Sequence, residues 1–141
     1  MIRPFIHRTV LCPWPEKIIQ RIVARSARFE PAIQGAVEIT IIGDKRMRTL
    51  NRIHRQIDRP TDVLSFGWND TKAVPSTMLG QIYLDYPLII RQAKRFKVTA
   101  LEEGTRMLVH GLLHLVGYDH GHQSEAKTMF TLQEKIVAAL K

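Results

Sequence analysis

His110 and His114 stand four residues apart, and their spacing is the strongest chemical signal in the sequence. On an α-helix, residues four apart lie on one face, so both imidazoles can bind the same metal ion. Gly117 follows where a helix commonly ends with a residue at positive φ, and the chain can then bring His120 towards the same point. Three neutral imidazoles leave one position of a tetrahedral Zn²⁺ open for water, as in a catalytic site. Such a metal lowers the pKa of its water to about 7.

The surroundings of these histidines matter, because two histidines at helical spacing are often ordinary core residues. Four of the six histidines fall within residues 110–122 among apolar neighbours, which favours a metal site. The spacing also matches the metzincin proteases, whose general base is a glutamate directly after the first histidine. Gly111 stands at that position here. A protease built on this motif would have its metal but lack its base.

A run of basic residues lies between positions 45 and 59, and four of its arginines recur at helical spacing: Arg48, Arg52, Arg55 and Arg59. A helix would place most of these four on one ridge. Guanidinium groups bind phosphate bidentately, and one beside a metal can stabilise charge developing on phosphorus. Each arginine alone could equally belong to a solvated helix face. Together with the histidine motif, the ridge favours phosphodiester hydrolysis over peptide hydrolysis, with Arg48, Arg52 and Arg59 as candidate contacts to RNA.

Length and composition limit the class of protein. A chain of 141 residues with 45% apolar residues is typical of one globular domain, here spanning residues 1–141. Cys12 is the only cysteine, which excludes an internal disulfide framework. No apolar run approaches the ~18 residues that span a bilayer, and the N-terminus lacks the apolar stretch of a signal peptide. We therefore expect a soluble cytoplasmic protein with no membrane partner, whose net charge of +8 favours polyanions such as nucleic acid.

Periodicity and turn residues predict the elements that position these side chains. Strands are expected over 2–11, 36–42 and 79–85 and at the end of the segment 58–66; helices are expected over 16–29, 45–55, 87–97, from Thr99 through the two histidines, and over 123–140. Asp44 and Thr99 are the expected N-caps of two helices, and 67–78 is expected to be a polar loop. This order predicts an α+β fold in which about five helices cover a small mixed β-sheet of about four strands, with the metal site on the helix that carries His-x3-His.

Several stretches resemble the YbeY family, the bacterial endoribonucleases that process rRNA. They are the histidine motif at 110–120, Leu50 to Arg55, Asp58 to Phe66, Leu79-Gly80-Gln81-Ile82, and Met129 with Gln133 and Glu134. The resemblance covers nearly the whole chain in the usual order. Two positions depart from the family pattern: His54 stands where a tyrosine is usual, and Gln81 where an aspartate is usual. The first change is expected to keep a packed ring, whereas the second removes a carboxylate.

The resemblance implies one Zn²⁺ per chain on His110, His114 and His120, with Ni²⁺ or another divalent ion as a possible substitute. It also implies a functional Arg55 close to the metal and the RNA, so that Arg55 and His114 are the predicted catalytic residues. Family members act in the cytoplasm on the 3′ end of small-subunit rRNA and in ribosome quality control. The implied partners are therefore an rRNA precursor and the ribosome or its small subunit with assembly proteins.

Other roles stay open in the sequence. Asp119 can orient a ligand imidazole through a hydrogen bond, or it can act as an acid or base. Asp62 and Thr61 are expected to hold the loop before the short strand in place. The nucleophile can be water or a 2′-hydroxyl group. The alternative functions are a non-catalytic ribosome-assembly factor with a structural zinc and, with less support, a zinc metalloprotease.

Overall fold

The computed structural model describes residues 1–67, 77–119, 121 and 123–141. Four strands and five helices occur in this part of the chain: β1 (Ile2–Arg8), α1 (Glu16–Phe29), β2 (Gly35–Ile42), α2 (Asp44–Arg55), β3 (Val63–Phe66), β4 (Gly80–Asp85), α3 (Tyr86–Phe96), α4 (Ala100–Leu115) and α5 (Gln123–Ala139). Their order is the predicted one, and the predicted α+β class is confirmed. The predicted loop over 67–78 lies mostly outside the described residues.

The four strands form one mixed sheet in the order β1-β2-β4-β3. β1 and β2 are parallel, as are β2 and β4, whereas β3 runs antiparallel to β4. β1 lies at one edge, which suits Pro4 because proline cannot donate a hydrogen bond to a second neighbouring strand. The central strands β2 and β4 carry buried β-branched and leucine side chains, including Ile39, Ile41, Ile82 and Leu84.

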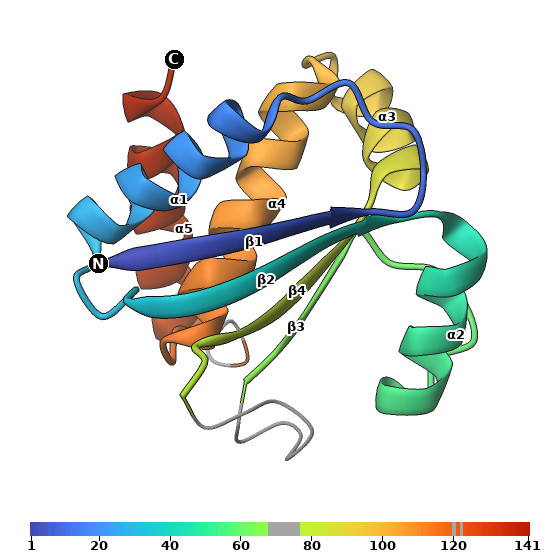
Figure 1. Ribbon diagram of the computed structural model, residues 1–141, viewed down its shortest axis with the longest axis horizontal. Coiled ribbons are helices and arrows are strands. Elements are labelled where there is room, and N and C mark those ends of the chain that lie inside the picture. The colour runs from blue at the N-terminus through green and yellow to red at the C-terminus, as the bar shows by residue number, and fades with distance from the viewer. Residues whose placement is uncertain (68–76, 120, 122) are drawn as a thin grey trace.

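Alternate residues of the central strands point to opposite faces of the sheet, and each face is covered differently (Figure 1). Helices α1, α3, α4 and α5 pack against the face that carries Ile41 and Ile82, where the larger apolar cluster lies. Helix α2 covers the other face with a smaller cluster made by Ile42, Met47, Leu64 and Phe66. None of the helices in the described part combines the length and apolar character that crossing a membrane demands.

The ends of α4 are defined by its own sequence. The side chain of Thr99 accepts a hydrogen bond from the backbone N–H of Glu102 (3.0 Å), which confirms the predicted N-cap. At the other end Gly117 adopts φ +104°, and its N–H donates to the carbonyl of His114 (3.1 Å). The N–H of Tyr118 donates to the carbonyl of Leu113 (3.1 Å), which completes a Schellman motif. The helix therefore ends at Leu115, one residue after the second histidine and just before Gly117, as predicted.

The predicted N-cap of α2 is wrong. The N-cap is Gly43 rather than Asp44, and Asp44 begins the helix with its carboxylate paired to Arg91 (2.9 and 3.1 Å). An ion pair with a neighbouring helix therefore replaces the local capping bond. The helix ends at Arg55, as predicted, because Gln56 takes the left-handed conformation (φ 58°). Arg59 thus lies beyond the helix and is not part of a continuous arginine ridge. The first strand is also shorter than expected and ends at Arg8.

Candidate active site

A pocket of about 280 Å³ lies where the end of α2, the segment 57–65 and α4 meet. Its polar lining includes Asn51 and Arg55 from α2, Arg59 and Asp62 from the following segment, and His110 and His114 from α4. The helix that carries the two histidines thus faces the segment that carries the arginines, although about 50 residues separate them in sequence. Both predicted catalytic residues, Arg55 and His114, contribute to this pocket.

The two described histidines of the motif lie one turn apart on α4, and both are partly buried. His114 also lines a second, smaller pocket of about 230 Å³ together with His54, Arg55 and Phe66. Arg55 and His114 therefore line both of these adjoining pockets. His120 lies outside the described residues, so its role as third ligand stays a prediction. Among the residues that are described, no group of three His, Cys, Asp or Glu side chains is arranged to hold a metal ion.

His110 is held from α5 by two side chains. The ring nitrogen Nδ1 of His110 lies 2.8 Å from the Oε1 atom of Gln133, which is buried with 3% of its surface exposed. The ring of Phe130 stacks on the imidazole at a centroid distance of 6.0 Å and an interplanar angle of 27°. The resemblance included Gln133, but the sequence did not predict its contact with the histidine motif. A polar residue on an otherwise apolar helix face was the available signal.

The segment after α2 is fixed to the helix and to β3 by short polar contacts. Buried Asn51 donates from Nδ2 to the carbonyl of Arg59 (2.8 Å). Asp62 Oδ1 accepts from the N–H of Val63 (2.8 Å) and from the hydroxyl of Thr61 (3.3 Å). The expected role of Asp62 and Thr61 in holding this loop is thus confirmed. These hydrogen bonds hold in place the backbone that carries Arg59 and follows Arg55.

The four arginines of the expected ridge divide into two groups. Arg55 and Arg59 line the pocket, whereas Arg48 and Arg52 are exposed on α2 and are not among its lining residues. Arg48 makes a bidentate contact with Asp58 (2.9 and 3.0 Å), and these hydrogen bonds hold the pKa of the Asp58 carboxyl below its usual value. Arg48 must therefore leave this partner to bind a phosphate, which makes it the weakest of the predicted RNA contacts.

Three further positions singled out in the sequence, His54, Gln81 and Asp119, lie in described parts of the structure. His54 packs its ring on Phe66 at 4.7 Å, so the departure from tyrosine keeps a packed ring as expected. Gln81 lies on β4 opposite Phe66 in the strand register. Asp119 is exposed and accepts a hydrogen bond from the N–H of Gly121 (3.1 Å). It lines a different pocket, beside Gly117 and α5, so its proposed action on a ligand imidazole stays a prediction.

Gly111 faces the sheet, not the pocket. A Cβ atom placed on it would lie 3.3 Å from Ile82 and 3.4 Å from Val63. A glutamate at this position, where the metzincin proteases carry their general base, would be pressed against an apolar sheet. The local packing therefore opposes the protease alternative more strongly than the absence of the glutamate alone.

The described residues fit a divalent metal ion in this pocket. Two imidazoles one helical turn apart line it, and the Nδ1 atom of one of them is engaged by an amide oxygen, as in protein sites where a second group orients a ligand histidine. Two arginines on the opposite wall can hold an anionic substrate. The donor set and the nearby charge suit a phosphodiester better than a neutral peptide.

Comparison with known proteins gives a consistent result. The family model described as Endoribonuclease YbeY matches residues 12–141. The chain is 36% identical over 135 residues to the Endoribonuclease YbeY of Brevibacillus brevis, covering 86% of this chain and 84% of that protein. It is 33% identical over 144 residues to the one of Halalkalibacterium halodurans, covering 94% and 91%.

A solved structure shows the same architecture. The solution structure of a Thermotoga maritima protein superposes on this chain with a TM-score of 0.67 at 26% identity, covering 98% of this chain and 89% of the other. The match extends over most of both chains and therefore concerns the fold as a whole. With the family model and the curated relatives, it shows that this chain belongs to the endoribonuclease YbeY family, whose members cut RNA within the strand.

Proposed function

We propose that this endoribonuclease cuts RNA at a divalent metal ion, Zn²⁺ in the simplest case, held by His110, His114 and His120. The observation that carries the proposal is that Arg55 and His114 line the same two pockets. When bound, the ion supplies Lewis-acid polarisation of a phosphate oxygen or activation of a water molecule. Ni²⁺ or another divalent ion can occupy the same ligands.

The side chains of this protein would act on the scissile phosphate from the wall opposite the histidines. Arg55, the last residue of α2, would bind the phosphate and stabilise the negative charge that grows on it during cleavage. Arg59 would add a second positive charge from the braced loop. Asp119 would orient a ligand imidazole or exchange a proton near the site. Arg52 and, more weakly, Arg48 would contact the RNA backbone further along α2.

The proposed substrate is single-stranded RNA at the 3′ end of small-subunit rRNA, processed in the cytoplasm on the ribosome or its small subunit with assembly proteins and as part of ribosome quality control. A net charge of +8 supports a polyanionic partner. Phe130 supports a single-stranded substrate, since an exposed aromatic ring beside the site offers a surface for an unpaired base. We also propose that residues 1–141 act as one domain, because four helices share one apolar cluster with the sheet.

The competing proposal is a non-catalytic assembly factor in which the metal mainly ties the last two helices to the sheet. The apolar packing of α4 and α5 weighs against that need. Leu112 of α4 and Met129 of α5 are buried in the same apolar cluster as Ile82 of the sheet. Arg106 of α4 also pairs with Glu134 of α5 (2.9 Å). A metal is therefore not required for that task.

The proposal is tested by incubating the purified protein with a small-subunit rRNA precursor while its metal content is measured. We expect His114→Ala to lose both metal and cleavage. We expect Arg55→Glu to retain the metal but to lose cleavage by about 10²–10³-fold, the usual cost of removing one group that stabilises transition-state charge. Arg95→Glu is the matched control, because Arg95 is exposed on α3 outside the pocket, and it should cut normally.

Metal-loaded wild-type protein that binds the RNA but leaves it intact would contradict a metal-dependent nuclease and favour the assembly factor. Arg55→Glu cutting as fast as Arg95→Glu would contradict the role given to Arg55. The ends of the products identify the nucleophile. A 2′,3′-cyclic phosphate indicates attack by the neighbouring 2′-hydroxyl, whereas a linear phosphate end indicates attack by water.

A further inference from the structure

The hydrogen bond between His110 and Gln133 has a direction that its surroundings determine. Nδ1 of His110 and Oε1 of Gln133 are 2.8 Å apart, and Gln133 is buried. An imidazole nitrogen can donate or accept, and so can the two ends of an amide. The direction of this hydrogen bond therefore depends on which way round the Gln133 amide lies.

The other end of the amide determines its orientation. Gln133 Nε2 donates to Oε2 of Glu134 (3.1 Å), and Glu134 is also bound by Arg106 through Nε (2.9 and 3.1 Å) and Nη2 (2.9 Å). These hydrogen bonds from Arg106 hold the pKa of Glu134 below its usual value. An ionised carboxylate can only accept hydrogen bonds. The amide nitrogen must therefore face Glu134, and the amide oxygen must face His110.

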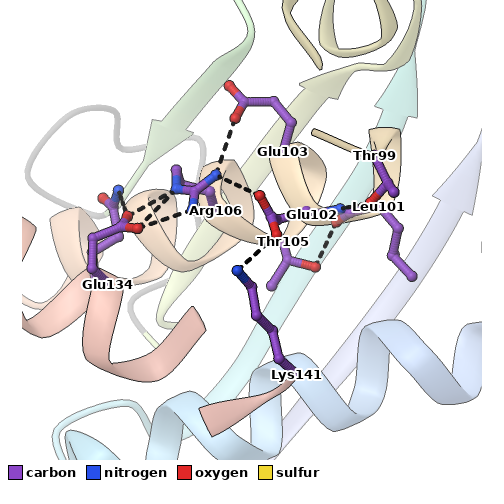
Figure 2. Close-up of polar contacts among 9 residues, drawn as sticks. Thr99, Leu101, Glu102, Glu103, Thr105, Arg106, Glu134 and Lys141 are labelled. Atoms are coloured by element: carbon purple, nitrogen blue, oxygen red, sulfur yellow. Dashed lines mark hydrogen bonds and ion pairs between the residues drawn. The ribbon is translucent and has the colours of Figure 1, made fainter. Parts of the chain in front are cut away.

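Arg106 is itself held from other directions, as Figure 2 shows. In addition to the contacts that Arg106 makes with Glu134, its Nη1 atom lies 3.4 Å from Oε1 of Glu103 and 3.7 Å from Oε2 of Glu102, which stand three and four residues earlier on the same helix. Lys141 pairs with the other oxygen of Glu102 (2.8 Å). The cation that orients Glu134 thus sits in a network of charges that joins α4 to α5 and to the last residue of the chain.

We propose that Gln133 is the positioning residue of the metal site: its amide oxygen accepts a hydrogen from Nδ1 of His110 and so keeps the unprotonated Nε2 available for the metal. A metal ligand must present a lone pair, and the hydrogen bond on the other ring nitrogen selects which nitrogen has it. Glu134 and Arg106 act one step further out by orienting the amide. This inference deepens the proposed function and rests on it for the presence of the metal.

The first test needs no metal and no variant of Gln133. The ¹⁵N chemical shifts of the histidine rings are recorded on the full-length, metal-free protein at about pH 8.5, roughly two units above the ordinary histidine pKa. His110→Asn identifies the His110 signals by their loss. We expect Nδ1 to carry the hydrogen and Nε2 to show the shift of an unprotonated nitrogen. A hydrogen on Nε2 would overturn the proposal.

The second test compares variants of similar side-chain length at position 133 that differ in their ability to accept a hydrogen bond. Gln133→Met has a similar length but accepts no strong hydrogen bond, so we expect it to populate the other tautomer of His110 and to bind Zn²⁺ about 10–100-fold more weakly in a competition assay. Gln133→Glu restores an acceptor, and it should recover the Nδ1–H tautomer and most of the affinity. Gln20→Met makes the same change at an exposed position of α1 and should match wild type.

Equal behaviour of Gln133→Met and Gln133→Glu would show that this position matters only for packing and would overturn the proposal. Unchanged tautomer and affinity in Gln133→Met would do the same. Wild-type protein that binds no Zn²⁺ would instead contradict the proposed function, and the tautomer of the metal-free protein would then still decide the role of Gln133. The two failures are therefore distinguishable.

Discussion

Phe130 is the residue that best shows how the site extends beyond its histidines. Its ring stacks on His110, yet 46% of its surface is exposed. An apolar ring that remains this exposed beside the pocket can accept the face of an unpaired base, because every base has a π-face. The same helix thus holds His110 through Gln133 and offers a stacking surface one turn earlier.

We therefore expect Phe130→Leu to weaken the binding of single-stranded RNA by about 1–2 kcal/mol, roughly 5–30-fold, because leucine keeps the apolar contact but has no ring to stack. Fluorescence anisotropy with a labelled oligonucleotide measures the change. Phe96→Leu is the matched control, since Phe96 is also exposed, at the end of α3. The stacking role is rejected if the two variants bind RNA equally well.

At the scale of an element, α3 begins on a buried carboxyl group. Asp85 is fully buried and caps α3 by accepting from the N–H of Leu88 (3.2 Å) through Oδ1. Its other oxygen, Oδ2, is buried and accepts no hydrogen bond from the described residues. Burial and the neighbouring Asp44 raise the pKa of Asp85 to about 7, whereas hydrogen bonds from Arg91 hold the pKa of Asp44 below its usual value.

This raised pKa predicts how stability depends on pH. Between about pH 4 and pH 7 the folded protein keeps a proton on Asp85 that the unfolded chain, with an ordinary pKa near 3.9, has released. The contribution of Asp85 to the free energy of unfolding therefore decreases as pH rises through that range and levels off above about pH 7. Asp85→Asn should remove this decrease, because asparagine is neutral and still caps a helix.

Urea unfolding of the metal-free protein at about pH 5 and pH 7.5 measures the effect. Asp58→Asn is the control, since the pKa of Asp58 is lowered and its titration lies below this range. The prediction is wrong if Asp85→Asn shows the same pH dependence as wild type and Asp58→Asn.

At the scale of the whole molecule, the net charge of +8 acts through particular arginines. Arg48 and Arg52 both lie exposed on α2, but Arg48 is paired with Asp58 whereas Arg52 makes no such bidentate contact among the described residues. Binding RNA through Arg48 therefore requires breaking one ion pair to form another. Equal formal charges on one helix should thus contribute unequally to RNA binding.

Salt dependence separates these contributions, because each phosphate contact to a single strand adds about −0.7 to the slope of log K against log salt. We expect Arg52→Gln to reduce the slope by about that amount and Arg48→Gln to change it little. Titrations of a single-stranded oligonucleotide at several salt concentrations measure both slopes. A larger loss for Arg48→Gln would contradict the importance given to the Arg48–Asp58 pair.

Local signals in the sequence predicted most of the helices and strands, and they predicted that His110 and His114 share one face of a helix. Period and turn residues predicted each helix and strand in order, and Gly117 alone predicted the end of α4 and a positive φ there. The predictions that were wrong concern competition between local and distant partners. Asp44 pairs with Arg91 instead of capping its own helix, because a charged partner from α3 is available only in the folded chain.

Only the tertiary structure decided which side chains meet. The spacing of His110 and His114 predicted a shared helix face, and the family resemblance implied that Arg55 lies near the metal site. Only the structure shows the pocket that Arg55 shares with His114 and the contact of Gln133 with Nδ1 of His110. Those contacts join segments more than 20 residues apart through the packing of α2, α4 and α5. Sequence patterns report periodicity within one element, whereas the direction of a hydrogen bond between elements depends on how their faces pack.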